Sequence, residues 1–454
     1  MAYQPDKMHP FRALVSLLLF LLPCTLSHND GVLSTNCKLL TPIVLQKDSL
    51  SADRYAVIFD AGSSGSRVHG FHFDKDLELV HIGNELELFV QVSPGLSAYA
   101  ENPQEAANSL LPLLEKANEF IPIDVQPDTP VKVGATAGLR MLGDEASEKI
   151  LQAVRDLLKT NSNFKTNDDW VTVLDGSQEG SYLWLAINYL LKNIGNDYSD
   201  TVGVVDLGGG STQMAYAISE ADAAKAPNVA PGDDPYVKII SVKGTKYYIY
   251  VHSYLNYGLL AFRGQILGVN KDAANPCILA GVYSYGGIDY KVSSPPSGSS
   301  IYMCREQVLE ALKVNEYCPY TNCTFDGVWN GGGGNGQNHM YVGSSFFDRA
   351  LQVGFINGSE GVADVRPLDF KMAAQDVCQT TFEDAKSIYP NVDPIYAWIW
   401  YGYGLQPEKY ITLMKQIKYQ DALVETAWPL GCAIEAVSSS NGIAAVTIRN
   451  AVQE

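Results

Sequence analysis

Residues 57–66 read Val-Ile-Phe-Asp-Ala-Gly-Ser-Ser-Gly-Ser, an apolar run that ends in an acidic residue and a stretch of glycines and serines. Residues 204–212, Val-Val-Asp-Leu-Gly-Gly-Gly-Ser-Thr, repeat that order of apolar pair, Asp and small residues. The two copies lie too far apart for a solenoid, whose units span roughly 20–45 residues. We therefore interpret the chain as a duplicated domain in which each half presents one Asp, Asp60 or Asp206, at the end of a buried strand.

The composition of both turns suits phosphate binding. Glycine allows positive φ and close backbone approach, so successive N–H groups can point at one phosphate, and serine hydroxyls add further donors. An Asp at the strand end can hold a hydrated divalent metal ion. An ordinary hairpin turn would explain either copy alone, but two facing copies favour a nucleotide bound in a cleft between two lobes.

Other phosphate-binding motifs are absent from the sequence. No Gly-x-x-x-x-Gly-Lys-Ser/Thr P-loop occurs. Gly331–Gly336 matches Gly-x-Gly-x-x-Gly, but it follows Trp329-Asn330 rather than a strand and opens no helix, so we interpret it as a loop.

Glu179 is the strongest single candidate for catalysis. It follows an expected strand over 171–174 and lies where a helix is expected to begin. If the site hydrolyses phosphoanhydrides, a carboxylate beside the metal can deprotonate water; the alternative is a Glu favoured by the helix dipole. Thr136 and Arg140 lie in another small-residue turn, useful for phosphate contacts or simply structural.

Periods of 2 and 3.6 alternate along most of the chain, which indicates an α/β fold. Strands are expected over 55–60, 67–73, 86–92, 131–135, 171–174, 202–206 and 214–218, with a hairpin over 236–250. Helices are expected over 103–118, 145–159, 182–192 and 422–437. Segments 293–300 and 330–338 are expected to be loops by composition.

Length and charge limit the function classes. The 454 residues, 46% hydrophobic and 18% charged, allow two or three domains with proper cores. An excess of 50 acidic over 32 basic residues, a net charge of −18, argues against nucleic-acid partners. An anionic substrate must then be bound locally, by backbone N–H groups, hydroxyls and a cation.

Residues 1–27 have the layout of a secretory signal peptide, with basic residues, the apolar run 13–26 and small residues before a cleavage site after Ser27. The run is short for a transmembrane helix, although an uncleaved membrane anchor is the alternative. We expect a secreted, extracellular, monomeric protein without a stable membrane span.

The cysteine content fits that route, because seven cysteines remain after residue 27 and at least one must be unpaired. The pairs Cys318–Cys323 and Cys277–Cys304 are expected to form disulfides. Two sequons, at Asn322 and Asn357, are usable glycosylation sites.

Five segments together carry a resemblance to a known family: 57–71, 134–142, 174–191, 204–216 and 424–436. They resemble, in order and spacing, the five apyrase conserved regions. From about residue 54 to the end the chain resembles the ecto-nucleoside triphosphate diphosphohydrolases, including plant apyrases and legume root lectin-nucleotide phosphohydrolases. The resemblance implies a two-lobed actin-like ATPase fold, each lobe an RNase H-like mixed sheet flanked by helices. It also implies Ca²⁺- or Mg²⁺-dependent hydrolysis of nucleoside tri- and diphosphates to the monophosphate.

The resemblance assigns roles to residues that match its motifs. Asp60 and Asp206 would hold the metal's water shell, Glu179 would be the catalytic base, and Ser211 and Gln213 would position the attacking water. Phosphate binding is expected from Ser63, Ser64, Gly65, Ser66, Arg67, Ala135, Thr136, Gly208, Gly209 and Gly210.

Base binding is less well defined by the family pattern. Phe346 and Phe347 fall where the family places an aromatic residue that stacks on the base, although core aromatics of a helix explain them equally. Tyr396 is the candidate for the other wall. It lies in segment 395–404, which is shortened relative to the family and lacks its Cys, so Cys378 is expected to be a free thiol.

Lobe I is expected over 28–175 with 420–454 returning to it, and lobe II over 176–419. The leading hypothesis is a secreted apyrase. The alternatives are a lectin-like oligosaccharide-binding or signalling protein on the same scaffold, and a kinase or exopolyphosphatase of the same superfamily; Glu179 favours transfer to water.

Overall fold

The computed structural model describes residues 25–29, 32–36, 53–230, 233–269, 274–277, 281–285, 288–293, 295, 300–379, 405–438 and 446–451. The chain divides into two compact units, Met1–Ser51 and Ala52–Glu454. In the first unit, β1 (Thr25–Asn29) and β2 (Val32–Asn36) form an antiparallel hairpin. Most of the expected signal peptide lies outside the described residues. Among the residues described, no helix combines the length and apolar character needed to span a membrane.

The first of two main sheets has five strands in the order β5-β4-β3-β6-β7. Its strands are β3 (Arg54–Ala61), β4 (Ser66–Phe73), β5 (Glu87–Val92), β6 (Val131–Ala135) and β7 (Val171–Val173). β3 pairs antiparallel with β4 and parallel with β6. Because β3 is central and covered on both faces, its residues form the continuous apolar run seen in the sequence. The expected strands of this region are confirmed.

The second sheet has eight strands in the order β15-β16-β14-β8-β9-β11-β10-β19. Its strands are β8 (Gly203–Leu207), β9 (Ser211–Ile218), β10 (Val237–Val242), β11 (Thr245–Leu255), β14 (Met340–Ser344), β15 (Val362–Val365), β16 (Ile411–Met414) and β19 (Thr447–Asn450). β8 pairs antiparallel with β9 and parallel with β14. The β3–β4 and β8–β9 hairpins are thus the duplicated unit that the sequence predicts.

Helices cover both sheets. The first sheet packs one face against α1 (Pro103–Asn108), α2 (Leu111–Phe120) and α4 (Asp144–Asn161), with the short α3 (Ala137–Arg140) after β6. The second sheet packs one face against α7 (Leu259–Val269), α8 (Ile301–Ala311), α9 (Ser345–Gln352) and α10 (Pro367–Gln379). A smaller helix, α6 (Glu220–Ala223), follows β9, and β12 (Gly281–Tyr285) and β13 (Ile288–Val292) form a separate hairpin.

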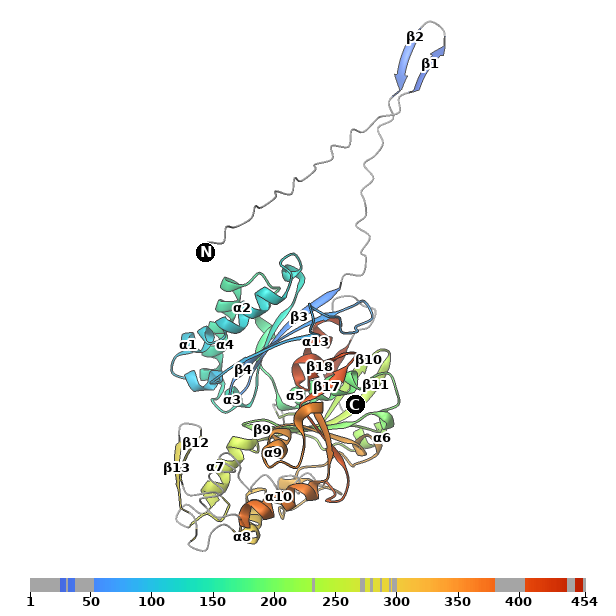
Figure 1. The fold of residues 1–454 in the computed structure, drawn as a ribbon. Coiled ribbons are helices and arrows are strands. Elements are labelled where there is room, and N and C mark those ends of the chain that lie inside the picture. Colours follow the sequence, from blue (N-terminus) through green and yellow to red (C-terminus); the bar gives the residue numbers. More distant parts are fainter. Residues whose placement is uncertain are drawn as a thin grey trace, which may run out of the picture. The chain divides into compact units, whose positions relative to one another are not determined.

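Two helices connect the sheets. α5 (Gly176–Leu190) contacts β9 and β11, and it packs along α13 (Trp428–Ser438), which contacts β3 (Figure 1). Every residue of α5 except Gln178 is buried, so this helix belongs to a core shared by both sheets. After α13 the chain returns to the second sheet, where β19 pairs with β10. The lobe boundaries at 175 and 420 stay a prediction.

Three expected helices differ from those in the structure. The helix over 103–118 is broken into α1 and α2, because Pro112 favours a new helix start. The helix expected to begin at 182 begins at Gly176, since Asp175 accepts a hydrogen bond from the Gln178 N–H and caps it. Residues 422–437 are not one helix: β18 (Ala422–Glu425) pairs with β17 (Gln416–Tyr419) before α13 begins.

The expected disulfides Cys277–Cys304 and Cys318–Cys323 are confirmed. Cys432 is a buried free thiol. The side chain of Cys378 lies outside the described part of the chain, so its expected free thiol stays a prediction.

Candidate active site

The two Asp-containing turns lie against each other. Asp60 and Asp206 are the penultimate residues of β3 and β8. A Cβ atom at Gly209 would lie 2.6 Å from the Ser63 hydroxyl oxygen, and one at Gly210 would lie 3.7 Å from the Ser63 Cβ. A side chain at position 209 would displace the Ser63 hydroxyl, so glycine favours the close approach of the second turn to the first.

Backbone hydrogen bonds from the start of α7 and the residues before it hold the second turn in place. The backbone N–H groups of Leu259 and Leu260 donate to the carbonyls of Gly208 and Gly209, at 2.8 and 2.9 Å. The Asn256 N–H donates to the Gly210 carbonyl, at 2.9 Å. Three consecutive carbonyl groups of this turn are thus engaged by the protein itself.

The two carboxylates have different partners. Arg67 Nη1 donates to Asp60 Oδ2 at 3.1 Å, whereas the Ser344 hydroxyl donates to Asp206 Oδ1. Burial raises the pKa of Asp206, and the negative charge of Asp60 adds to the rise, while Ser344 and Arg67 oppose it. Two acids that repel each other across a partly buried site favour a cation between them.

The donor set fits a hydrated divalent ion. Carboxylate oxygens are the protein ligands preferred by Ca²⁺ and Mg²⁺, and Mg²⁺ in particular keeps several waters. In the part of the chain that the structure describes, no group of three or more His, Cys, Asp or Glu side chains converges to form a metal cage. The arrangement therefore suits an ion held mainly through water and substrate.

Glu179 lies in the first turn of α5 and is 7% exposed. Its Oε2 accepts a hydrogen bond from Arg140 Nη2 at 2.5 Å. Burial raises the pKa of Glu179 to about 8; Arg140 opposes the rise, and the charges of Asp206 and Asp60 add to it. A carboxylate with a raised pKa is a stronger proton acceptor than an ordinary Glu.

Polar side chains from the second sheet surround this ion pair. Gln213 Nε2 lies 2.8 Å from both Ser211 Oγ and Ser253 Oγ. Arg140 Nη1 donates to Ser253 Oγ at 3.2 Å, and Arg140 Nη2 approaches Ser211 Oγ at 3.4 Å. The expected catalytic residues Glu179, Ser211 and Gln213 therefore belong to one network centred on Arg140.

The expected phosphate-binding residues are only partly accessible. Ser64 is exposed and Ser63 is half-buried, so both hydroxyls can reach a ligand. Ser66 is fully buried, and its Oγ has no hydrogen-bond partner among the described residues. Ala135 is also fully buried, and Thr136, 6% exposed, donates its N–H to the Ala61 carbonyl at 3.1 Å. The side chain of Ser66 therefore does not face the open side of the turn.

The aromatic candidates for base binding are not displayed to solvent. Phe346 and Phe347 are 2% and 1% exposed and belong to the core beneath the second sheet. Phe346 packs edge-on against Phe370, with ring centroids 5.9 Å apart. This placement favours their alternative interpretation as core aromatics. Tyr396 lies outside the described residues.

Sequence reasoning missed two polar residues of the site. Ser253 lies on β11 directly opposite Gln213 of β9, and Ser344 ends β14 beside β8. No local motif marks either serine. Strand pairing alone brings them to the site, and no signal in the sequence around them indicates that register.

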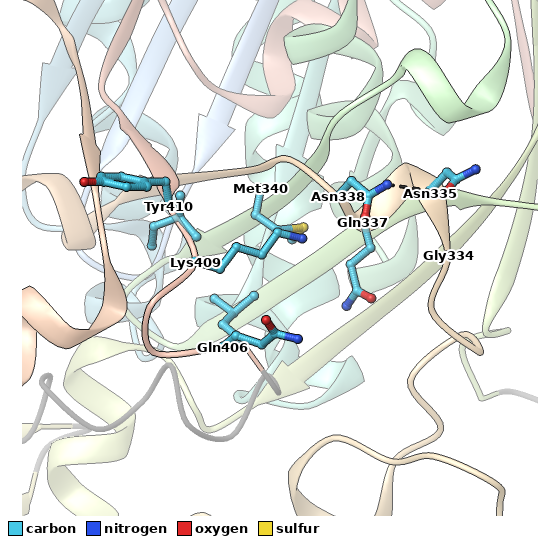
Figure 2. Close-up of a pocket in the computed structure, with 10 residues that line it drawn as sticks. Gly334, Asn335, Gln337, Asn338, Met340, Gln406, Lys409 and Tyr410 are labelled. Atoms are coloured by element: carbon cyan, nitrogen blue, oxygen red, sulfur yellow. Dashed lines mark hydrogen bonds between the residues drawn. The ribbon is translucent and has the colours of Figure 1, made fainter.

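A separate cavity of about 320 Å³ lies at the edge of the second sheet where β14 and β16 begin (Figure 2). It is lined by Gly334, Asn335, Gln337, Asn338, Met340, Leu405, Gln406, Lys409, Tyr410 and Ile411. Met340 and Ile411 begin β14 and β16, whereas Asp206 and Ser344 lie at the opposite ends of their strands. The cavity is therefore distinct from the carboxylate cluster.

Two α/β halves with facing Asp-containing turns define a protein of the actin-like ATPase fold. A solved structure described as nucleoside triphosphate hydrolases from Neospora caninum shares this fold, with a TM-score of 0.56. It is 16% identical and covers 84% of this chain and 92% of its own.

The chain belongs to the GDA1/CD39 (nucleoside phosphatase) family, whose sequence profile matches residues 46–449. It is 54% identical to Apyrase 1 of Arabidopsis thaliana, over 86% of this chain and 87% of that protein. It is 48% identical to a nucleoside-triphosphatase of Pisum sativum, over 94% of this chain and 96% of that protein. These relatives are described as nucleotide hydrolases, and they lend the oligosaccharide-binding alternative no support.

Proposed function

We propose that this protein hydrolyses nucleoside tri- and diphosphates, such as ATP and ADP, to the monophosphate, with water activated by Glu179. The proposal rests mainly on the placement of Glu179 within a polar network beside two facing turns. Each turn follows a strand that has an Asp near its end. The apyrase relatives support the same substrate class.

Substrate phosphates would bind to the two turns. The exposed Ser64 and half-buried Ser63 offer hydroxyl donors from the first turn. In the second turn the Gly208 N–H donates to the Ser211 carbonyl, so the N–H groups of Gly209 and Gly210 would be the donors to phosphate. Arg67 supplies the positive charge nearest Asp60. This set replaces the lysine that a P-loop would offer to the phosphates.

Asp60 and Asp206 would hold a Ca²⁺ or Mg²⁺ ion through its water shell. When bound, such an ion neutralises charge on the phosphate oxygens. Burial and, to a smaller extent, the charge of Asp60 raise the pKa of Asp206, and attraction to the cation would oppose both.

Glu179 would take a proton from water as the water oxygen attacks the terminal phosphorus. The P–O bond to the leaving nucleotide breaks, and the leaving oxygen keeps the electron pair. Arg140 would hold Glu179 in place through the hydrogen bond between Arg140 Nη2 and Glu179 Oε2. Ser211 and Gln213 would orient the same water.

The N-terminal segment, the sequons at Asn322 and Asn357 and the two disulfides support secretion and glycosylation. We propose that the protein acts outside the cell.

The test is phosphate release from ATP and from ADP by residues 28–454 produced in a secretory host, with Ca²⁺, with Mg²⁺ and with chelator. Glu179→Gln should lower release by about 10²–10⁴-fold, the usual contribution of a general base. Glu145→Gln, an exposed helix position, is the matched control. Release that persists in chelator or in Glu179→Gln would overturn the proposal.

A further inference from the structure

Ser253 is the residue of the Arg140 network that has no role so far. It lies in β11, opposite Gln213 in the antiparallel register with β9, and it is half-buried. Its Oγ lies within hydrogen-bond distance of Gln213 Nε2 and Arg140 Nη1, at 2.8 and 3.2 Å. Ser253 thus connects the residue expected to orient water with the residue that holds the expected base.

The hydrogen bonds of the Gln213 side-chain amide fix its orientation. An amide nitrogen carries two N–H donors, and Nε2 has two hydroxyl acceptors, Ser211 Oγ and Ser253 Oγ, both at 2.8 Å. With Nε2 saturated, the remaining group of the amide is the carbonyl oxygen Oε1, which can only accept. Removal of either hydroxyl would leave one N–H unsatisfied and allow the amide to rotate.

Both acceptor positions of the Ser253 hydroxyl oxygen are also used. A hydroxyl oxygen accepts two hydrogen bonds, and those of Gln213 Nε2 and Arg140 Nη1 use both lone pairs. Ser253 Oγ accepts a hydrogen bond from Arg140 Nη1, while Glu179 Oε2 accepts one from Arg140 Nη2. The position of Arg140 relative to Glu179 therefore depends on this serine.

Tight packing places Ser253 at this point. A Cβ atom at Gly176 would lie 2.1 Å from the Ser253 Cβ and 2.6 Å from Arg140 Nη1. One turn later, a Cβ at Gly180 would lie 2.7 Å from Val251 Cγ2. Two glycines on one face of α5 thus let β11 lie directly against the helix that carries Glu179.

We propose that Ser253 is a positioning residue for the attacking water, on the basis of the proposed function. It holds Gln213 with Oε1 turned toward the water and holds Arg140 beside Glu179. The water donates one hydrogen bond to the Glu179 carboxylate and the other to Gln213 Oε1. As the oxygen attacks phosphorus, the first proton passes to Glu179 and the leaving phosphate oxygen keeps the electron pair of the broken bond.

The test compares Ser253→Ala with Gln213→Ala and with the double variant. Ser253→Ala should lower kcat for ATP by about 10–100-fold, as expected when a reacting group is misplaced, and leave KM within about twofold. The double variant should be no slower than Gln213→Ala, because both changes remove one function. Ser241→Ala, on neighbouring β10 and equally half-buried, should retain wild-type kcat.

Three outcomes separate the hypotheses. Wild-type kcat in Ser253→Ala, or losses that multiply in the double variant, would overturn the role of Ser253 while Glu179→Gln still defines the reaction. No hydrolysis by the wild-type protein would instead overturn the proposed function. If Ser253→Ala melts at a much lower temperature, Ser253→Thr keeps the hydroxyl, and its kcat must then exceed that of the Ala variant.

Discussion

The turn after β3 and the turn after β8 share their order of residues but differ in the side chains that serve them. Asp60 has a cationic partner, Arg67, from the next strand of its own hairpin. Asp206 has a neutral partner, Ser344, from a strand far along the chain. The first turn is followed by the buried Ser66, whereas the second leads into Ser211 and Gln213.

The backbone beneath each turn is nevertheless supported in the same way. A Cβ atom at Gly95 would lie 2.2 Å from the Gly62 carbonyl oxygen, and one at Gly258 would lie 2.4 Å from the Ser211 nitrogen. Both halves thus place a glycine against the turn.

The side chains around the two turns differ, and this difference indicates a division of labour. The first half supplies positive charge for phosphate, and the second half supplies uncharged polar groups for water.

Removal of either carboxylate should have the largest effect, and the two halves should behave alike. Asp60→Asn and Asp206→Asn should each lower metal-dependent kcat by at least about 10²-fold, because both would hold one ion. Thermal unfolding with and without Ca²⁺ gives a second measurement, since an ion that binds only the folded state raises Tm. Ca²⁺-induced stabilisation that persists in one variant would show that the halves do not share the ion.

The pH dependence should report Glu179, which lies between the halves. Its pKa is raised from 4.5 to about 8, mainly by burial, so activity should fall as pH drops through a value at or below about 8. A bound cation near Asp206 and Asp60 lowers that value. The kcat/KM profile measures it.

The free energy of unfolding should change with pH in the opposite direction to activity, because the contribution of Glu179 decreases as pH rises. Because the folded-state pKa of Glu179 is the higher one, its contribution to stability is complete below pH 4.5 and is lost as pH rises toward about 8. Glu179→Gln should flatten this slope in denaturant unfolding measured from pH 5 to 8. An unchanged slope would mean that Glu179 is ionised throughout.

The supporting glycines should show an equal, intermediate effect. Gly95→Ala and Gly258→Ala force a methyl group into backbone atoms, and such overpacking costs about 1–3 kcal/mol of unfolding free energy. Gly358→Ala, whose Cβ would meet the flexible Leu351 side chain at 3.3 Å, is the control. Urea unfolding gives the comparison, and a loss at only one of the two glycines would argue that the turns are not equivalent.

The smallest effects should be on Ca²⁺ affinity, which should change in opposite directions when the partner of Asp60 or the partner of Asp206 is removed. Arg67→Ala removes a cation and should strengthen Ca²⁺ binding severalfold while raising KM for ATP. Ser344→Ala removes an uncharged donor that favours the ionised form of Asp206, the form that binds Ca²⁺, and should weaken Ca²⁺ binding by about tenfold, equivalent to roughly 1.4 kcal/mol. Calorimetric titration with Ca²⁺ measures both, with Ser345→Ala as the control; changes of the same sign would contradict the division of labour.

The strands and turns of both hairpins could be predicted because their signals are local: an apolar run, an Asp and then glycines. The break at Pro112 and the start of α5 at Gly176 differ from the expected helices, although Pro112 and the capping residue Asp175 are both recognisable helix-start signals. Ser253 and Ser344 could not be predicted, since they reach the site only through the pairing of β11 with β9 and of β14 with β8. Likewise, no sequence pattern distinguishes the half-buried Ser63 from the fully buried Ser66.

Hydrolysis of ATP in ¹⁸O-labelled water tests most directly whether Glu179-activated water attacks the terminal phosphorus. We predict one labelled oxygen in each released phosphate and none in the nucleoside monophosphate. The rate of labelling should be lost in Glu179→Gln but not in Glu145→Gln. Label in the nucleotide, or an undiminished rate in Glu179→Gln, would contradict it.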